Sequence, residues 1–196
     1  MAFGFISIIG GSFIGGFWLI LIGWFLQSGA QAYLQQHELS AALSGIVLKD
    51  IMNTRFVSVR PDITIKELLS NYFNLYRKSE FPVTAKDDDD TGILLGAVTT
   101  KQAMDVPEAD AEKMKVEQIM TLTHDLIIMS PDRHADEALK RMYQENKGRV
   151  FVCIGSPPKL IGIISKTDIL NIATERQEYE REVKKSSATS NFNKQG

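Results

Sequence analysis

The chain has 196 residues, enough for one or two domains, and its 44% apolar and 23% charged residues are ordinary for a globular protein. A net charge of −2 without a basic stripe argues against nucleic-acid binding, so no nucleic-acid partner is expected. The single cysteine, Cys153, excludes an intramolecular disulfide, and its apolar neighbours predict a buried, inert thiol in a strand.

Residues 1–26 are predicted to form a transmembrane segment. Between Ala2 and Leu26 the only polar side chains are Ser7 and Ser12, and a spanning helix needs roughly 20 apolar residues. The basic start of a signal peptide is missing. The paired glycines in this stretch could lie within a single membrane span or form a turn between two spans. The alternative to a membrane segment is a buried helix of a soluble protein. We expect a membrane location with the remaining chain on the cytoplasmic side, although no basic flank sets the orientation.

Residues 27–45 have apolar or small side chains at helical spacing, which predicts a helical connector that ends at Gly45. An internal repeat follows, with its first copy at 46–106 and its second at 107–173. "LKDIMNTRFVSVRPDITIKELL" aligns with "VEQIMTLTHDLIIMSPDRHADEAL", "EFPVTA" with "RVFVCI", and "LLGAVTT" with "LIGIISK". We call the two copies repeat 1 and repeat 2.

Each repeat is predicted to run strand, helix, strand, turn, strand, helix. Pro61-Asp62 and Pro131-Asp132 precede the first helix of each repeat, where the aspartate is able to cap. The segment "AKDDDDTG" is predicted to be a solvated hairpin loop, since it lacks the alternating ligands of a calcium loop. "GSPPK" is the matching turn in repeat 2. In the last segment, 174–196, we expect an exposed helix and then a disordered tail.

Catalytic and metal-binding motifs are missing from the sequence. None of the histidines, His37, His124 and His134, lies in H-E-x-x-H or another metal-ligand spacing. There is no G-x-S-x-G, no Walker loop and no G-x-G-x-x-G. We therefore predict no catalytic residues, no metal site and no enzymatic activity for this chain.

The stretch "GIISKTDIL" carries the main candidate site. Gly162 permits a close backbone approach, and Ser165 can cap the helix that follows. The N-terminus of that helix suits a phosphate, and Lys166 adds positive charge. Asp168, in the first turn, can accept hydrogen bonds from both hydroxyls of a ribose. S-x-x-D is equally a capping box that needs no ligand, and this motif alone leaves both readings open.

The repeat pair resembles a tandem pair of cystathionine-β-synthase (CBS) domains over roughly residues 46–173. The resemblance rests on "VLKDIM", "VSVRPDITIKELL", "EFPV" and "LGAVTT" in repeat 1, and on "VEQIM", "IIMSPDRHADEALKRM", "GRVFV" and "IGIISKTDIL" in repeat 2. It implies an α+β fold in which two β-α-β-β-α units form an antiparallel pseudo-twofold pair, here preceded by the transmembrane helix. It also implies homodimers and a regulatory adenosine ligand (AMP, ADP, ATP or S-adenosylmethionine), with no cofactor required.

The family's ribose carboxylate matches Asp168 and its strand-end hydroxyl matches Ser165 and Thr99, while the backbone beside the adenine matches residues 148–150. The candidate nucleotide-binding set is therefore Ser165, Lys166, Asp168, Gly148, Arg149, Val150, Thr99 and Gln102. The sequence departs from the family pattern where Gln102 replaces the carboxylate in repeat 1 and Phe151 replaces a proline in repeat 2. The two clefts should be unequal, with tighter binding at Asp168.

The apolar N-terminal stretch followed by this pair resembles the C-terminal end of CBS-containing site-2 protease homologues, which are intramembrane zinc metalloproteases. The resemblance implies a membrane-tethered module that senses adenine nucleotides and modulates a membrane protease partner. A ligand-free dimerisation module and the non-catalytic fragment of a zinc metalloprotease are the alternatives. The sequence leaves open whether the chain is a short protein or the end of a longer one.

Overall fold

A computed structural model describes residues 42–85 and 92–192, together with Trp18 and Ile22. The chain divides into two compact units at residue 42. Trp18 and Ile22 are helical, and both side chains are exposed. Apart from these two residues, the predicted transmembrane segment lies outside the described residues, and so does most of the helical connector. Within the described part of the chain, no helix has both the length and the apolar character needed to cross a membrane.

Repeat 1 begins with a single helical turn and continues as a helix followed by a β-hairpin and a second helix. Its elements are α3 (Leu48–Ile51), α4 (Ile65–Leu68), the π-helical turn η1 (Leu69–Phe73), α5 (Asn74–Tyr76), β1 (Glu80–Ala85), β2 (Ile93–Thr99) and α6 (Thr100–Met104). Repeat 2 follows the same plan with one difference. Short strands precede its main helix, whereas the strand predicted before the helix of repeat 1 is reduced to an isolated bridge between Val59 and Val83. Its elements are η2 (Val116–Gln118), β3 (Thr121–Leu122), η3 (Thr123–Asp125), β4 (Ile128–Met129), α7 (Ala135–Gln144), β5 (Arg149–Ile154), β6 (Lys159–Ser165) and α8 (Lys166–Phe192).

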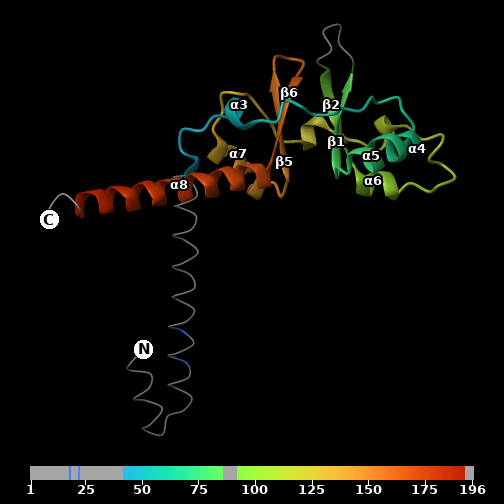
Figure 1. Ribbon diagram of the computed structural model, residues 1–196. Coiled ribbons are helices and arrows are strands. Elements are labelled where there is room, and N and C mark those ends of the chain that lie inside the picture. Colours follow the sequence, from blue (N-terminus) through green and yellow to red (C-terminus); the bar gives the residue numbers. More distant parts are fainter. Residues whose placement is uncertain (1–17, 19–21, 23–41, 86–91, 193–196) are drawn as a thin grey trace. The chain divides into compact units, whose positions relative to one another are not determined.

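The described strands form one mixed sheet in the order β1-β2-β6-β5-β4, with β3 paired to β2. The pairs β1–β2 and β5–β6 are antiparallel hairpins, and β4 runs parallel to β5. In Figure 1 the helices α4, α5 and α6 lie beside the first hairpin, and α7 and α8 lie beside the second. The α+β fold with two pseudo-equivalent units, which the sequence predicts, is confirmed.

The segment that precedes the first strand of each repeat crosses to the other repeat. Asn53 of repeat 1 exchanges two backbone hydrogen bonds with Ile163 of repeat 2, at 2.9 and 3.1 Å. In the equivalent position of the other half, Gly96 and Ala97 of β2 pair with β3. The sequence pattern did not predict this exchange, because short segments without strong periodicity do not reveal their partners.

Glycines make both crossings possible. A Cβ on Gly96 would lie 2.3 Å from the carbonyl oxygen of Thr121, and one on Gly162 would lie 2.5 Å from the sulfur of Met52. At Gly96 the obstructing atom belongs to the backbone, and at Gly162 the Met52 side chain would have to shift to make room. The close approach predicted at Gly162 is confirmed, and it recurs at the matching residue of repeat 1.

The cores reflect the same organisation. One buried cluster lies mainly in repeat 1, with Leu68, Phe73 and Phe81, and takes in Val116 of repeat 2. A second joins Leu94 of repeat 1 to Phe151 and other side chains of repeat 2. Strands β1 and β5 are buried along nearly their whole length, as their continuous apolar runs predict. The two repeats therefore share part of their hydrophobic core and are not independent domains.

Two predictions need correction. Asp62 does not cap the first helix: α4 begins at Ile65, and its cap is Thr64, whose side chain accepts the N–H of Glu67. Asp132 is likewise not a cap, because α7 begins at Ala135 after His134. Pro-Asp instead forms the turn before each cap, and Asp62 pairs with Arg60.

Helix α8 is longer than the composition suggested, because it continues to Phe192, into the segment assigned to a disordered tail. The residues of that segment have modest helix propensity. Extending an existing helix nevertheless adds one hydrogen bond per residue fixed and needs no new nucleus, so such residues can continue it. The exposed helix predicted from Glu175 onward is confirmed.

Cys153 lies in β5 with 6% of its surface exposed, and burial raises the pKa of its thiol to about 12. At pH 8 only about one thiol in ten thousand is then the reactive thiolate. We expect iodoacetamide to leave the native chain unlabelled over an hour and to label it fully in guanidinium chloride, as measured by intact mass. Labelling of the native chain at the rate of a free thiol would contradict the buried environment.

Candidate functional site

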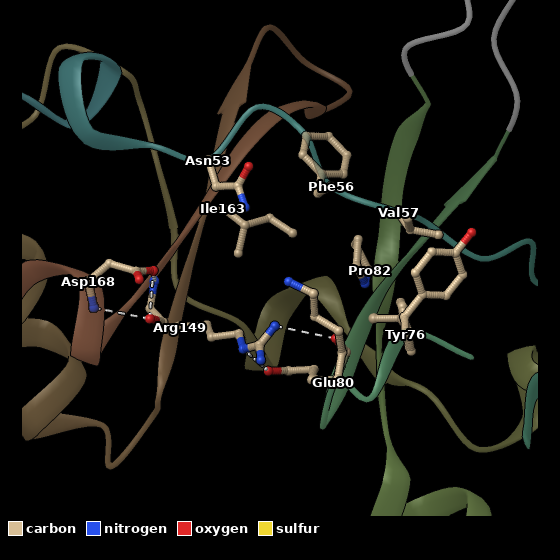
Figure 2. A pocket seen from close by; sticks show the side chains of 12 residues that line it. Asn53, Phe56, Val57, Tyr76, Glu80, Pro82, Arg149, Ile163 and Asp168 are labelled. Carbon is tan, nitrogen blue, oxygen red and sulfur yellow. Dashed lines mark hydrogen bonds and ion pairs between the residues drawn. The ribbon is translucent and has the colours of Figure 1, made fainter. Parts of the chain in front are cut away.

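A cavity of about 190 Å³ lies where the two repeats meet (Figure 2). The segment before the first strand of repeat 1, the start of β1 with the turn before it, and the end of β6 with the start of α8 all contribute to its wall. The lining residues are Asn53, Phe56, Val57, Tyr76, Lys78, Glu80, Phe81, Pro82, Arg149, Ile163, Ser165 and Asp168. Ser165, Asp168 and Arg149 of the predicted set thus line one cavity.

Ser165 and Asp168 form a reciprocal cap at the β6–α8 junction. The backbone N–H and the hydroxyl of Ser165 donate to Oδ2 of Asp168, at 2.9 and 2.6 Å, and the N–H of Asp168 donates back to Oγ at 3.2 Å. Among the described residues, none donates to the other carboxylate oxygen, Oδ1. The capping role predicted for Ser165 is confirmed, and the carboxylate keeps an oxygen available for a ligand.

Three other predicted residues support the cavity without lining it. Lys166 donates its backbone N–H to the carbonyl of Gly148 at 2.9 Å, and its ammonium lies 4.3 Å from the ring centre of Tyr143. This cation–π contact holds the charge against α7. Val150 is fully buried and pairs with Ile164 in the sheet. These residues fix the spacing between β5 and α8.

Arg149 makes the most extensive contacts of any charged side chain in the cavity. Its Nε lies 3.2 Å from Oε2 of Glu80, its Nη1 donates to the Glu80 carbonyl at 3.3 Å, and its Nη2 donates to Ser79 Oγ at 3.3 Å. Both side chains of the ion pair are about four-fifths buried, at 22% and 21% exposed. Burial raises the pKa of the Glu80 carboxyl, and the charges of Arg149 and Lys147 oppose that shift.

Sequence analysis did not identify the opposite wall of the cavity. Asn53, Phe56, Tyr76, Lys78 and Glu80 all come from repeat 1, whereas the motif that points to the site lies in repeat 2. In the sequence, the only residue of this wall that had drawn attention was Pro82 in "EFPV". It marked the alignment of the two repeats and was not predicted to line a site. The opposite wall follows only from the way the repeats pair.

The matching position in repeat 1 is organised differently. The N–H and hydroxyl of Thr99 donate to Oε1 of Gln102, at 2.8 and 2.9 Å, in the same kind of cap. The amide nitrogen of Gln102 then donates to the carbonyl of Ile119 and the hydroxyl of Thr121, both at 3.0 Å. An aspartate has no such donor. Gln102 thus ties repeat 1 to the crossing segment of repeat 2, and neither Thr99 nor Gln102 lines the cavity described above.

Replacing Gln102 by alanine is expected to lower the free energy of unfolding by about 1–3 kcal/mol, because the cap acceptor is lost and two part-buried groups lose their donor. Urea unfolding of the full chain measures this. Gln118 is the matched control: it also caps, accepting the N–H of Lys115 at 2.8 Å, but it is exposed. Gln118→Ala should cost less than about 1 kcal/mol, and equal losses in the two variants would contradict the role of the inter-repeat bonds.

The two paired repeats, their crossed segments and the shared cavity define a tandem-repeat α+β module. Residues 48–108 and 116–175 match the CBS domain family. The chain therefore belongs to the CBS domain family, as the resemblance of its sequence implied.

Two kinds of known protein are similar to the chain. Zinc metalloprotease MJ0392 of Methanocaldococcus jannaschii is 32% identical over 152 residues, which cover 78% of this chain and 39% of that protein. The chain spans about two fifths of the length of the curated relatives that it matches.

Among solved structures, the CBS domain of a bacterial CNNM/CorC family Mg²⁺ transporter in complex with ATP has a TM-score of 0.60, 18% identity and coverage of 71% and 97% of the two chains. A hemolysin-like protein containing a CBS domain from Oenococcus oeni PSU has a TM-score of 0.56, 21% identity and coverage of 70% and 96%. At these identities the likeness establishes the fold.

Proposed function

We propose that this CBS pair is a regulatory module that binds an adenosine compound (AMP, ADP, ATP or S-adenosylmethionine) in the cavity at Asp168. The observation that carries the proposal is the Asp168 carboxylate, which lines the cavity and keeps Oδ1 free of donors from the described residues. A carboxylate in this position suits the two hydroxyls of a ribose. If other residues already donated to both carboxylate oxygens, Asp168 could not bind the ribose hydroxyls in this way.

The rest of the lining fits the other parts of such a ligand. Phe56 and Tyr76 offer aromatic surface for a base, and Lys78 and Arg149 offer positive charge for phosphates. The structurally similar transporter domain was solved with ATP, which supports the same ligand class here.

The proposed output is the modulation of a zinc metalloprotease in the membrane. The matched curated relatives are zinc metalloproteases by name, and the apolar stretch up to Leu26 would hold the module at a membrane, with the CBS pair on the cytoplasmic side. Ligand binding at the repeat junction would change the relative pose of the repeats, and the partner would respond to that change.

Isothermal titration calorimetry of the full chain in mild detergent tests the ligand. We expect saturable heat with one site per chain for at least one of ATP, ADP, AMP and S-adenosylmethionine. Cytidine monophosphate should bind more weakly than AMP, because its smaller base would contact less of the aromatic surface. No heat and no thermal shift at millimolar concentration for all four compounds would overturn the proposal.

A second candidate is a dimerisation module that works without a ligand. Large apolar side chains are exposed on three helices: Leu75 on α5, Met104 on α6 and Tyr143 on α7. A second copy of the chain would cover such surface. Light scattering of the full chain in detergent, with and without AMP, separates the candidates: the scaffold predicts a dimer whose dissociation constant does not change with AMP.

A further inference from the structure

Glu80 and Arg149 are the first residues of β1 and β5, which are equivalent strands of the two repeats. The same position therefore carries opposite charges in the two copies, and the two side chains meet across the cavity (Figure 2). The Arg149 side chain extends from the side of β5, where Asp168 lies, toward Glu80 on the side of β1. This is the one charged contact between repeats that lines the cavity within the described part of the chain.

The charges of the lining cancel in this state. Lys78 and Arg149 contribute two positive charges, and Glu80 and Asp168 contribute two negative ones. An anionic ligand would thus meet no net attraction as long as the Glu80 carboxylate neutralises the guanidinium. A phosphate group offers more acceptor oxygens than that single carboxylate oxygen and can bind a guanidinium with two parallel hydrogen bonds.

The Glu80 carboxylate is also poorly stabilised where it lies. Burial raises its pKa even though Arg149 and Lys147 are near, which means that the nearby positive charges do not fully offset the loss of hydration. The Glu80 side chain is 21% exposed, so it already contacts water in part. The exchange of this carboxylate for a phosphate is therefore structurally feasible without unfolding either strand.

We propose that Glu80 is an exchangeable internal counter-ion of Arg149, which the phosphate of a ligand displaces when its ribose binds at Asp168. This inference rests on the proposed function and adds a mechanism of regulation to it. Because Glu80 belongs to repeat 1 and Arg149 to repeat 2, displacement removes an ion pair between the repeats. A phosphorylated ligand thereby changes the contact between repeats, and a neutral nucleoside leaves it intact.

The test compares AMP with adenosine by calorimetry on the full chain in detergent, for the wild type, Glu80→Gln and Arg149→Gln. Glu80→Gln is expected to tighten AMP binding about three- to fivefold, the scale of a partly exposed ion pair, and to leave adenosine within about twofold. Arg149→Gln is expected to weaken AMP about tenfold or more and to leave adenosine unchanged.

Inorganic pyrophosphate, which has no nucleoside, separates this inference from the proposed function. If pyrophosphate binds Glu80→Gln more tightly than wild type and fails to bind Arg149→Gln, the counter-ion role holds even where no adenosine compound binds. Weaker AMP binding by Glu80→Gln, or equal effects on AMP and adenosine, would overturn the inference while keeping the nucleotide site. Absence of binding by every probe to every variant would overturn both.

Discussion

Gly96→Ala is expected to lower the free energy of unfolding by about 2–3 kcal/mol, because the added methyl group would overlap with backbone that cannot easily move. The added Cβ would lie 2.3 Å from the carbonyl oxygen of Thr121. That oxygen belongs to the backbone of β3, which pairs with β2 at Gly96 and Ala97, so relief requires one strand to move away from the other. Urea unfolding of the full chain, followed by circular dichroism, measures the loss.

Two other glycines provide matched controls. At Gly162 the obstructing atoms belong to the Met52 side chain, which can partly rotate away, so Gly162→Ala should cost about 1–2 kcal/mol. Shortening the obstruction with Met52→Ala should recover part of that cost. At Gly148 nothing lies within 4 Å of the new Cβ, and Gly148→Ala should stay within about 0.5 kcal/mol of wild type. A loss at Gly96 no larger than at Gly148 would show that the crossed segments are not tightly packed.

These glycines also show what the sequence could and could not predict. Local patterns of apolar residues and turn residues predicted the repeat, the α+β class and most of the order of the elements. The first strand predicted for repeat 1 is present only as an isolated bridge at Val59. The crossing of Asn53 to β6 depends on which distant segments meet, and nothing local encodes it. The prediction that another segment approaches Gly162 closely was correct, but the residue that does so, Met52, could be found only from the structure.

The candidate site likewise contains residues that the sequence predicts and residues whose roles only the structure reveals. Ser165 and Asp168 form a local motif, so their cap was predictable from four residues of sequence. Arg149 was selected for its backbone, yet its guanidinium makes the contacts that matter, with Glu80 on the other repeat. The role of Gln102 was visible only as a missing carboxylate. The hydrogen bonds that its side-chain amide donates to Ile119 and Thr121 give the physical reason, because an amide, unlike a carboxylate, can accept in the cap and also donate across the repeats.

Replacing Asp168 by asparagine is expected to weaken AMP binding about 10- to 100-fold, the range for losing charge-assisted hydrogen bonds to two ribose hydroxyls. Asparagine keeps the size of aspartate, and its carbonyl can still accept from the N–H and hydroxyl of Ser165. The cap should survive at a cost below about 1 kcal/mol in unfolding free energy. Calorimetry gives the affinity, and urea unfolding of the same samples gives the stability.

A ligand without the ribose hydroxyls shows whether Asp168 contacts them directly. Wild type should bind AMP about 10- to 100-fold more tightly than 2′,3′-dideoxy-AMP, whereas Asp168→Asn should bind the two compounds within a few-fold of each other. A variant that loses affinity for both compounds equally would assign Asp168 to the cap alone, because distortion of the β6–α8 junction does not depend on the hydroxyls. The discrimination between the two ligands therefore distinguishes a ribose contact from a helix cap, the two readings that the motif left open.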